Sequence, residues 1–113
     1  MNHITPLFTA LAAVILTCGT VDFAHAESLG RPQQGRAIAE GVCAECHAVQ
    51  ERGVRSPNPD APTFAAIAAT PGITTLALTA ALQTSHRTMP NIVLQPDERR
   101  DVIAYILSLK DGI

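Results

Sequence analysis

The sequence predicts an all-α domain that follows a removable N-terminal segment. Three observations lead to this prediction. Apolar residues recur at helical spacing towards both ends of the domain, in segments 35–42 and 97–110. Alanine is abundant in the segment between them, which favours helix over strand. The residues before Cys43 contain no run of β-branched side chains that would indicate a strand.

Residues 1–26 have the layout of a secretory signal peptide. An uncharged apolar run, residues 6–21, is followed by the small residues Ala24 and Ala26, which a signal peptidase reads. Cleavage is therefore predicted before Glu27, and the protein is expected in the periplasm. An uncleaved membrane anchor is the alternative, although the apolar run is short for a span of about 20 residues.

The domain that would remain, residues 27–113, is small and almost neutral. Removing the first 26 residues takes away one acidic side chain, Asp22, so the formal charge changes from −2 to −1. The domain therefore lacks the concentrated basic surface of a nucleic-acid-binding protein. Its only aromatic residues are Phe64 and Tyr105. A chain of this size and composition buries a modest core, which a cofactor would complete.

The first and last helices are the most clearly marked elements. The first runs up to Cys43, and its apolar face consists of Gly35, Ile38, Ala39 and Val42. Pro96 suits the first position of the last helix, where acidic residues 97–98 complement the helix dipole. The apolar face of this helix consists of Val102, Tyr105, Ile106 and Leu109. Gly112 suits its end.

The middle of the domain is marked less clearly. Residues 62–69 predict a short helix behind Pro62, and the pair Pro71 and Gly72 predicts a turn. Residues 75–83 fit both a strand and a helix, and their alanine content favours the helix. The proline-rich stretch before Pro62 is expected to be a loop.

Two cysteines and a histidine stand together in the stretch GVCAECHAV, residues 41–49. A structural zinc site usually takes two separated pairs of ligands, but the domain offers only Cys43, Cys46, His47 and His86. A thioredoxin-like dithiol follows a buried strand, which is not predicted here. Covalent haem attachment accounts for every residue of the motif. Each cysteine would form a thioether with one haem vinyl group, and His47 would be the proximal iron ligand.

A second iron ligand is expected from the segment SHRTMPN. It contains Met89, the only methionine of the predicted domain, and Pro90 and Pro96 exclude a continuous helix there. A methionine on a loop suits the distal position of a haem. The alternatives are a core methionine that fills a gap, and ligation by His86 instead. Met89 is the preferred ligand, and His86 is expected to be a solvated loop residue.

With these motifs in view, the chain resembles the small bacterial class I c-type cytochromes over residues 30–110. Three blocks carry the resemblance: a helix leading into CAECH (35–47), Met89 followed by proline, and a C-terminal helix with a tyrosine (97–110). Their order and distances are highly specific. The resemblance implies the class I cytochrome c fold, in which the first and last helices cross beside one covalently bound haem c. It also implies an iron held by His47 and Met89.

The resemblance further implies particular contacts near the haem. Gly35 and Ile38 of the first helix would meet Tyr105 and Ile106 of the last. In the family, a proline carbonyl accepts a hydrogen bond from the proximal histidine. Pro62 matches that proline best, with Pro59 as the alternative. Many members bind a haem propionate with a tryptophan, which this chain lacks. The candidate substitutes are Arg55, Arg87 and Tyr105.

The function implied by the resemblance is electron transfer rather than catalysis on a substrate. The haem iron would cycle between Fe(II) and Fe(III), from a dehydrogenase or respiratory donor to an oxidase or reductase acceptor. The expected partners are redox proteins, with no nucleic acid and with membrane contact only through partner complexes. The chain is expected to be a monomer. The rival interpretations are a haem-based sensor or enzyme with an exchangeable Met89, and a dedicated subunit of one oxidoreductase complex.

Overall fold

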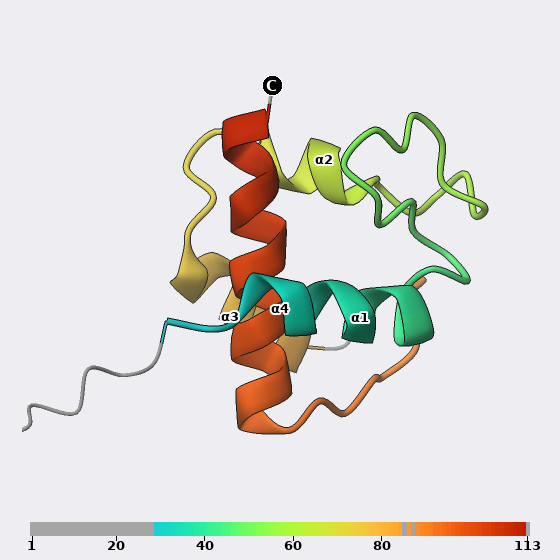
Figure 1. Cartoon of the computed structure of the whole chain (residues 1–113). Coiled ribbons are helices and arrows are strands. Elements are labelled where there is room, and N and C mark those ends of the chain that lie inside the picture. The colour runs from blue at the N-terminus through green and yellow to red at the C-terminus, as the bar shows by residue number, and fades with distance from the viewer. Residues whose placement is uncertain (1–28, 85, 87, 113) are drawn as a thin grey trace, which may run out of the picture.

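A computed structural model describes residues 29–84, 86 and 88–112 of the chain, and they form a helical domain. The elements are α1 (Pro32–Val42), α2 (Phe64–Ala68), α3 (Thr75–Gln83), α4 (Pro96–Ser108) and a final 3₁₀ turn, η1 (Leu109–Gly112) (Figure 1). Within those ranges the only β pairing is an isolated bridge between His86 and Met89. The predicted all-α class is confirmed. The predicted signal peptide, residues 1–26, lies outside the described residues.

The helices begin where the local sequence satisfies their first N–H groups. Pro32 and Pro96 stand at the starts of α1 and α4, where a missing N–H costs nothing. The Thr63 and Thr74 hydroxyls accept hydrogen bonds from the backbones of Ala66 (3.0 Å) and Ala77 (3.1 Å), and so cap α2 and α3. The segment that fitted both strand and helix is therefore helical. No helix in the described part of the chain is long and apolar enough to cross a membrane.

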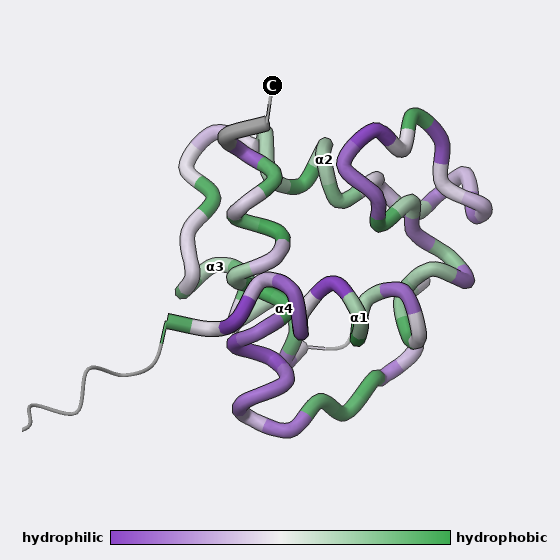
Figure 2. Tube along the Cα trace, viewed as in Figure 1, coloured by the Kyte–Doolittle hydropathy of each residue, from purple (hydrophilic) through white to green (hydrophobic). Residues whose placement is uncertain are grey.

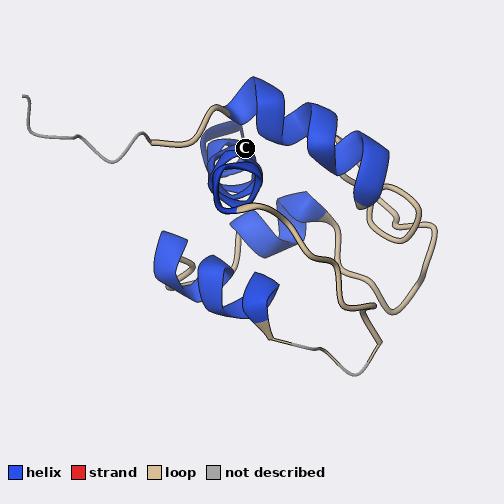
Figure 3. Cartoon of the chain, turned by 90° about the horizontal axis from the view of Figure 1, so that it is seen from below, coloured by secondary structure: helices blue, strands red, loops and turns tan. Residues whose placement is uncertain are grey.

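The crossing of α1 and α4 organises the domain (Figures 1 and 3). Gly35 is buried at the crossing, and a Cβ atom there would overlap the carbonyl oxygen of Asp101. The predicted crossing is confirmed, and its point of closest approach at Gly35 lies about one turn before Tyr105 and Ile106 in α4. Gly35 lies closest to the backbone of Asp101 and Val102. A residue without a side chain allows the two backbones to touch.

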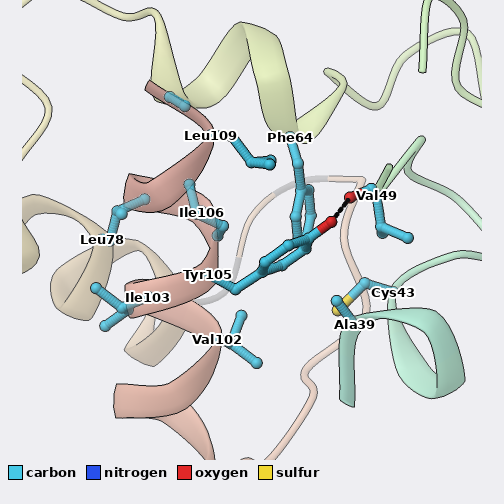
Figure 4. Close-up of a cluster of buried hydrophobic side chains, with 11 residues drawn as sticks. Ala39, Cys43, Val49, Phe64, Leu78, Val102, Ile103, Tyr105, Ile106 and Leu109 are labelled. Carbon is cyan, nitrogen blue, oxygen red and sulfur yellow. Dashed lines mark hydrogen bonds between the residues drawn. The ribbon is translucent and has the colours of Figure 1, made fainter. Parts of the chain in front are cut away.

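The core lies between α4 and the other helices (Figure 4). The apolar face predicted for α4 is buried, and Ile103 joins it. The other buried apolar residues are Ala39, Cys43, Val49, Phe64, Ala68 and Leu78. Figure 2 shows that apolar and polar residues are interspersed along α4. Among the larger side chains of the described residues, only Val102 is completely enclosed by protein, so the polypeptide alone supplies a thin core.

An ion pair that the sequence did not predict ties the chain before α1 to α4. The Asp101 carboxylate accepts a hydrogen bond from the backbone N–H of Arg31 (2.7 Å) and another from its guanidinium (2.9 Å). Asp101 is buried, and the hydrogen bonds from Arg31 lower the pKa of its carboxyl below the ordinary value. Next to this ion pair, a Cβ on Gly30 would overlap the Arg100 carbonyl oxygen. The backbone before α1 therefore lies directly against the backbone of α4.

We expect this ion pair to make the domain sensitive to acid. Because the folded pKa of Asp101 lies below the unfolded value of about 4, its carboxylate stabilises the fold above that pH. The contribution is lost as the pH falls through the folded pKa. Asp101→Asn should therefore lower the free energy of unfolding by about 1.5 kcal/mol at pH 7. The free energy of unfolding should also fall less steeply below pH 4 in this variant than in the unmodified protein. Denaturant titrations at several pH values would measure both effects.

The exposed pair of Arg36 and Glu40 provides the control. Arg36 donates to the Glu40 carboxylate (2.8 Å) one helical turn away, and both side chains are open to solvent. Pairs of this kind contribute little to stability. Glu40→Gln should leave both the unfolding free energy and its pH dependence almost unchanged. If the Asp101 and Glu40 variants lost the same amount of unfolding free energy, the burial of Asp101 would not contribute to stability.

Candidate functional site

The CAECH motif forms a tight turn that continues directly from α1. The N–H of Cys43 donates to the Ala39 carbonyl (2.8 Å), so the cysteine still belongs to the last helical turn. The N–H groups of Cys46 and His47 both donate to the Cys43 carbonyl, at 3.1 and 2.9 Å. The chain therefore folds back on itself, with Cys43 buried and with Cys46 and His47 half-buried.

The two thiols do not have the features of a metal-thiolate site. Burial raises the pKa of the Cys43 thiol, which disfavours the thiolate that binds zinc. In the part of the chain that the structure describes, no group of three or more His, Cys, Asp or Glu side chains is arranged to hold a metal ion. Both Cys43 and Cys46 are free thiols and not a disulfide.

The ring of His47 is oriented by a hydrogen bond to the backbone. Its Nδ1 lies 2.7 Å from the carbonyl oxygen of Pro62, the contact that the resemblance implied, and this contact does not involve Pro59. A carbonyl oxygen can only accept, so Nδ1 must carry the hydrogen. Nε2 then has a free lone pair. This tautomer leaves one nitrogen of His47 ready to bind a metal ion.

The loop between His47 and Pro62 is fastened to the CAECH turn. The buried Ser56 hydroxyl accepts a hydrogen bond from the Ala48 N–H (3.0 Å), and the Asn58 N–H donates to the Cys46 carbonyl (3.2 Å). An open depression of about 540 Å³ lies along this loop and is lined in part by the exposed Arg55. No sequence pattern around Ser56 distinguishes it from an ordinary loop serine, so this contact is visible only in the fold.

Met89 lies in a non-helical segment, as its flanking prolines predicted. It is half-buried, and its N–H donates to the His86 carbonyl (3.3 Å) in the isolated bridge. His86 is exposed, which agrees with the expected solvated position. The chain from Met89 to α4 runs along the side of the molecule where α1 ends (Figures 1 and 3). Arg87, a candidate partner for a propionate, lies outside the described residues.

The hydroxyl of Tyr105, one of the candidate partners for a propionate, is hydrogen-bonded to the backbone. The hydroxyl donates its single hydrogen to the carbonyl oxygen of Val49 (2.7 Å), and both residues are buried (Figure 4). In this arrangement the hydrogen is not available to a haem propionate. Tyr105 is on the core face of α4 and points towards the segment after CAECH. The same burial raises the pKa of its phenol.

The residues present fit a haem better than they fit a bare metal ion. A porphyrin brings four nitrogen ligands of its own, so the protein needs to supply only axial ligands and attachment points. His47 offers Nε2, and Met89 offers a thioether sulfur. Cys43 and Cys46 offer two thiols on a single turn. The thin core also leaves apolar side chains in solvent, including Val93 on the chain leading into α4, which is 79% exposed.

Comparisons with known proteins agree with this chemistry. The family model described as cytochrome c matches residues 32–110, which run from the start of α1 into η1. A protein called cytochrome c-552, from Bradyrhizobium diazoefficiens, is 36% identical over 76 residues. That alignment covers 67% of this chain and 72% of the relative. No solved structure gives a significant match. The family match includes both the CAECH turn and the Met89 segment.

Proposed function

Because this chain belongs to the cytochrome c family, we propose that it is a periplasmic monohaem carrier that exchanges single electrons with protein partners. Family membership implies electron transfer and covalently bound haem c with its iron, and both cysteines needed for attachment are present. The finer points are part of the proposal: the periplasmic location, the respiratory or dehydrogenase donor, and the oxidase or reductase acceptor.

In this proposal each site residue has one task. Cys43 and Cys46 hold the haem by thioethers, His47 binds the iron through Nε2, and Met89 binds it on the other face. When bound, the haem supplies the Fe(II)/Fe(III) couple. The observation that carries the proposal is the 2.7 Å hydrogen bond from His47 to Pro62, because it fixes the tautomer and the direction of the ring. A ligand held by the backbone need not move when the iron changes its oxidation state.

The proposal excludes an open iron coordination site, which a sensor or an enzyme would require. We expect the purified ferrous protein to bind carbon monoxide extremely slowly at neutral pH, because Met89 occupies the distal position. We also expect the ferric protein to be reduced rapidly by one cellular fraction, periplasmic or membrane, that contains its donor. Stopped-flow absorption spectroscopy measures both rates. Rapid stoichiometric binding of carbon monoxide to the unmodified protein would favour a sensor or an enzyme instead.

A further inference from the structure

We propose that Tyr105 is a positioning residue for His47, acting through both chain segments that hold the histidine ring. The proposal rests on the assignment of His47 as an iron ligand. It assigns to Tyr105 a function beyond filling the core, namely tuning the hydrogen bond between His47 and Pro62 and with it the reduction potential.

The histidine is held where two short segments, 47–49 and 62–64, lie side by side. At one end, Nδ1 of His47 donates to the Pro62 carbonyl (2.7 Å). Beside it, the N–H of Phe64 donates to the Ala48 carbonyl (2.9 Å). The distance between the His47 ring and the Pro62 carbonyl therefore depends on how firmly these two segments are kept together.

Tyr105 contacts both segments from α4. Its hydroxyl donates to the Val49 carbonyl (2.7 Å), which fixes the first segment two residues after the histidine. Its ring lies against Phe64 of the second segment, with the ring centres 6.3 Å apart and the planes at 52°. The Phe64 ring in turn lies 5.7 Å from the ring of His47. Figure 4 shows Tyr105 reaching from α4 to Val49, with Phe64 beside its ring.

The loss of this hydroxyl should be transmitted to the histidine. The Val49 carbonyl is buried, so without Tyr105 it would have to turn towards water or stay unpaired. Either outcome loosens segment 47–49 against segment 62–64. A weaker hydrogen bond at Nδ1 makes the imidazole a poorer electron donor, because such a bond raises the basicity of a metal-bound histidine. A poorer donor stabilises ferric iron less, so the potential should rise.

Tyr105→Phe in the holoprotein tests the proposal, because it removes only the hydroxyl and keeps the ring against Phe64. In the ferrous protein, the His47 Nδ1 hydrogen should exchange with deuterium about tenfold faster, as expected when one buried hydrogen bond is lost. At a fixed applied potential, the ratio of ferric to ferrous protein should fall about threefold. Nuclear magnetic resonance and spectroelectrochemistry measure these two quantities.

Ile103→Val is the matched control. Ile103 is equally buried in α4, but it points towards Leu78 and away from Tyr105 (Figure 4). The variant should lower the denaturation midpoint while leaving the Nδ1 exchange rate and the potential unchanged. If Tyr105→Phe changes neither quantity, or if Ile103→Val changes both to the same extent, Tyr105 is only a core residue and the proposal is wrong.

Two further measurements keep the test decisive. The wild-type ferrous spectrum tests the premise alone: if the His47 ring protons lack the large shifts caused by a haem ring current, the ligand assignment fails, whatever Tyr105 does. If Tyr105→Phe yields no holoprotein, 3-fluorotyrosine can replace the single tyrosine of the chain. Its more acidic phenol donates a stronger hydrogen bond at pH 6. Slower Nδ1 exchange and a lower potential would support the proposal, and unchanged values would overturn it.

Discussion

Replacing Cys43 or Cys46 with serine should leave little or no haem-containing protein. Each cysteine sulfur is expected to add across one haem vinyl group, with its hydrogen passing to the neighbouring carbon, and a serine hydroxyl does not make this bond. The effect should be large because we expect the fold to depend on the cofactor. Val102 is the only larger side chain that the described protein encloses completely, so the chain without haem has little apolar burial to offset the entropy of folding.

The measurement is haem staining after denaturing electrophoresis, together with extraction into acidified acetone. In the unmodified protein the haem should stay with the polypeptide during electrophoresis and during extraction. Glu45→Gln is the matched control, since Glu45 is exposed between the two cysteines and the variant keeps their spacing. It should attach haem normally. If either serine variant retains a full complement of unextractable haem, that cysteine is not an attachment point.

The sequence predicted the helices well where local chemistry is decisive. Pro96 marked the start of α4, and the spacing of its apolar residues identified its buried face. The segment 75–83 is ambiguous by periodicity, and the threonine cap at Thr74 is the local signal that favours helix there. Elements of this kind are specified by neighbours within one or two turns, and such neighbours can be read from the sequence.

Contacts between distant residues could not be predicted in the same way. Asp101 looked like an ordinary polar residue of α4, and only the packing of α1 brings Arg31 to it. Tyr105 is one of the residues that could replace the missing tryptophan at a propionate. The sequence could not show that Val49, 56 residues earlier in the chain, supplies the acceptor for the tyrosine hydroxyl. The pairing of His47 with Pro62 was implied by family resemblance, and no local pattern indicated it.

Substitution of Met89 should change the properties of the bound iron more than any other single replacement on the distal side. A thioether is a soft ligand and a poor donor to ferric iron, so it favours the ferrous state, whereas histidine favours the ferric state. Met89→His should therefore lower the reduction potential by on the order of 0.1 V or more, part of the roughly 0.8 V that axial ligands control. The iron should stay six-coordinate.

Met89→Ala should have a different result, because alanine offers no replacement ligand. The distal position should open, and carbon monoxide should bind rapidly to the ferrous protein. In both Met89 variants, the weak long-wavelength absorption band of ferric iron bound to sulfur should disappear. Absorption spectroscopy, redox titration and stopped-flow mixing with carbon monoxide together distinguish a changed ligand from a lost one.

His86→Ala is the control, because His86 is the competing ligand in the same segment. Its side chain is exposed, and its carbonyl, which accepts the Met89 N–H (3.3 Å), is retained in the variant. The variant should therefore keep the sulfur band, the potential and the slow reaction with carbon monoxide. The opposite pattern, in which His86→Ala opens the iron and Met89→Ala does not, would show that the haem has two histidine ligands. Since histidine donates better to ferric iron, the expected high potential would then be lost as well.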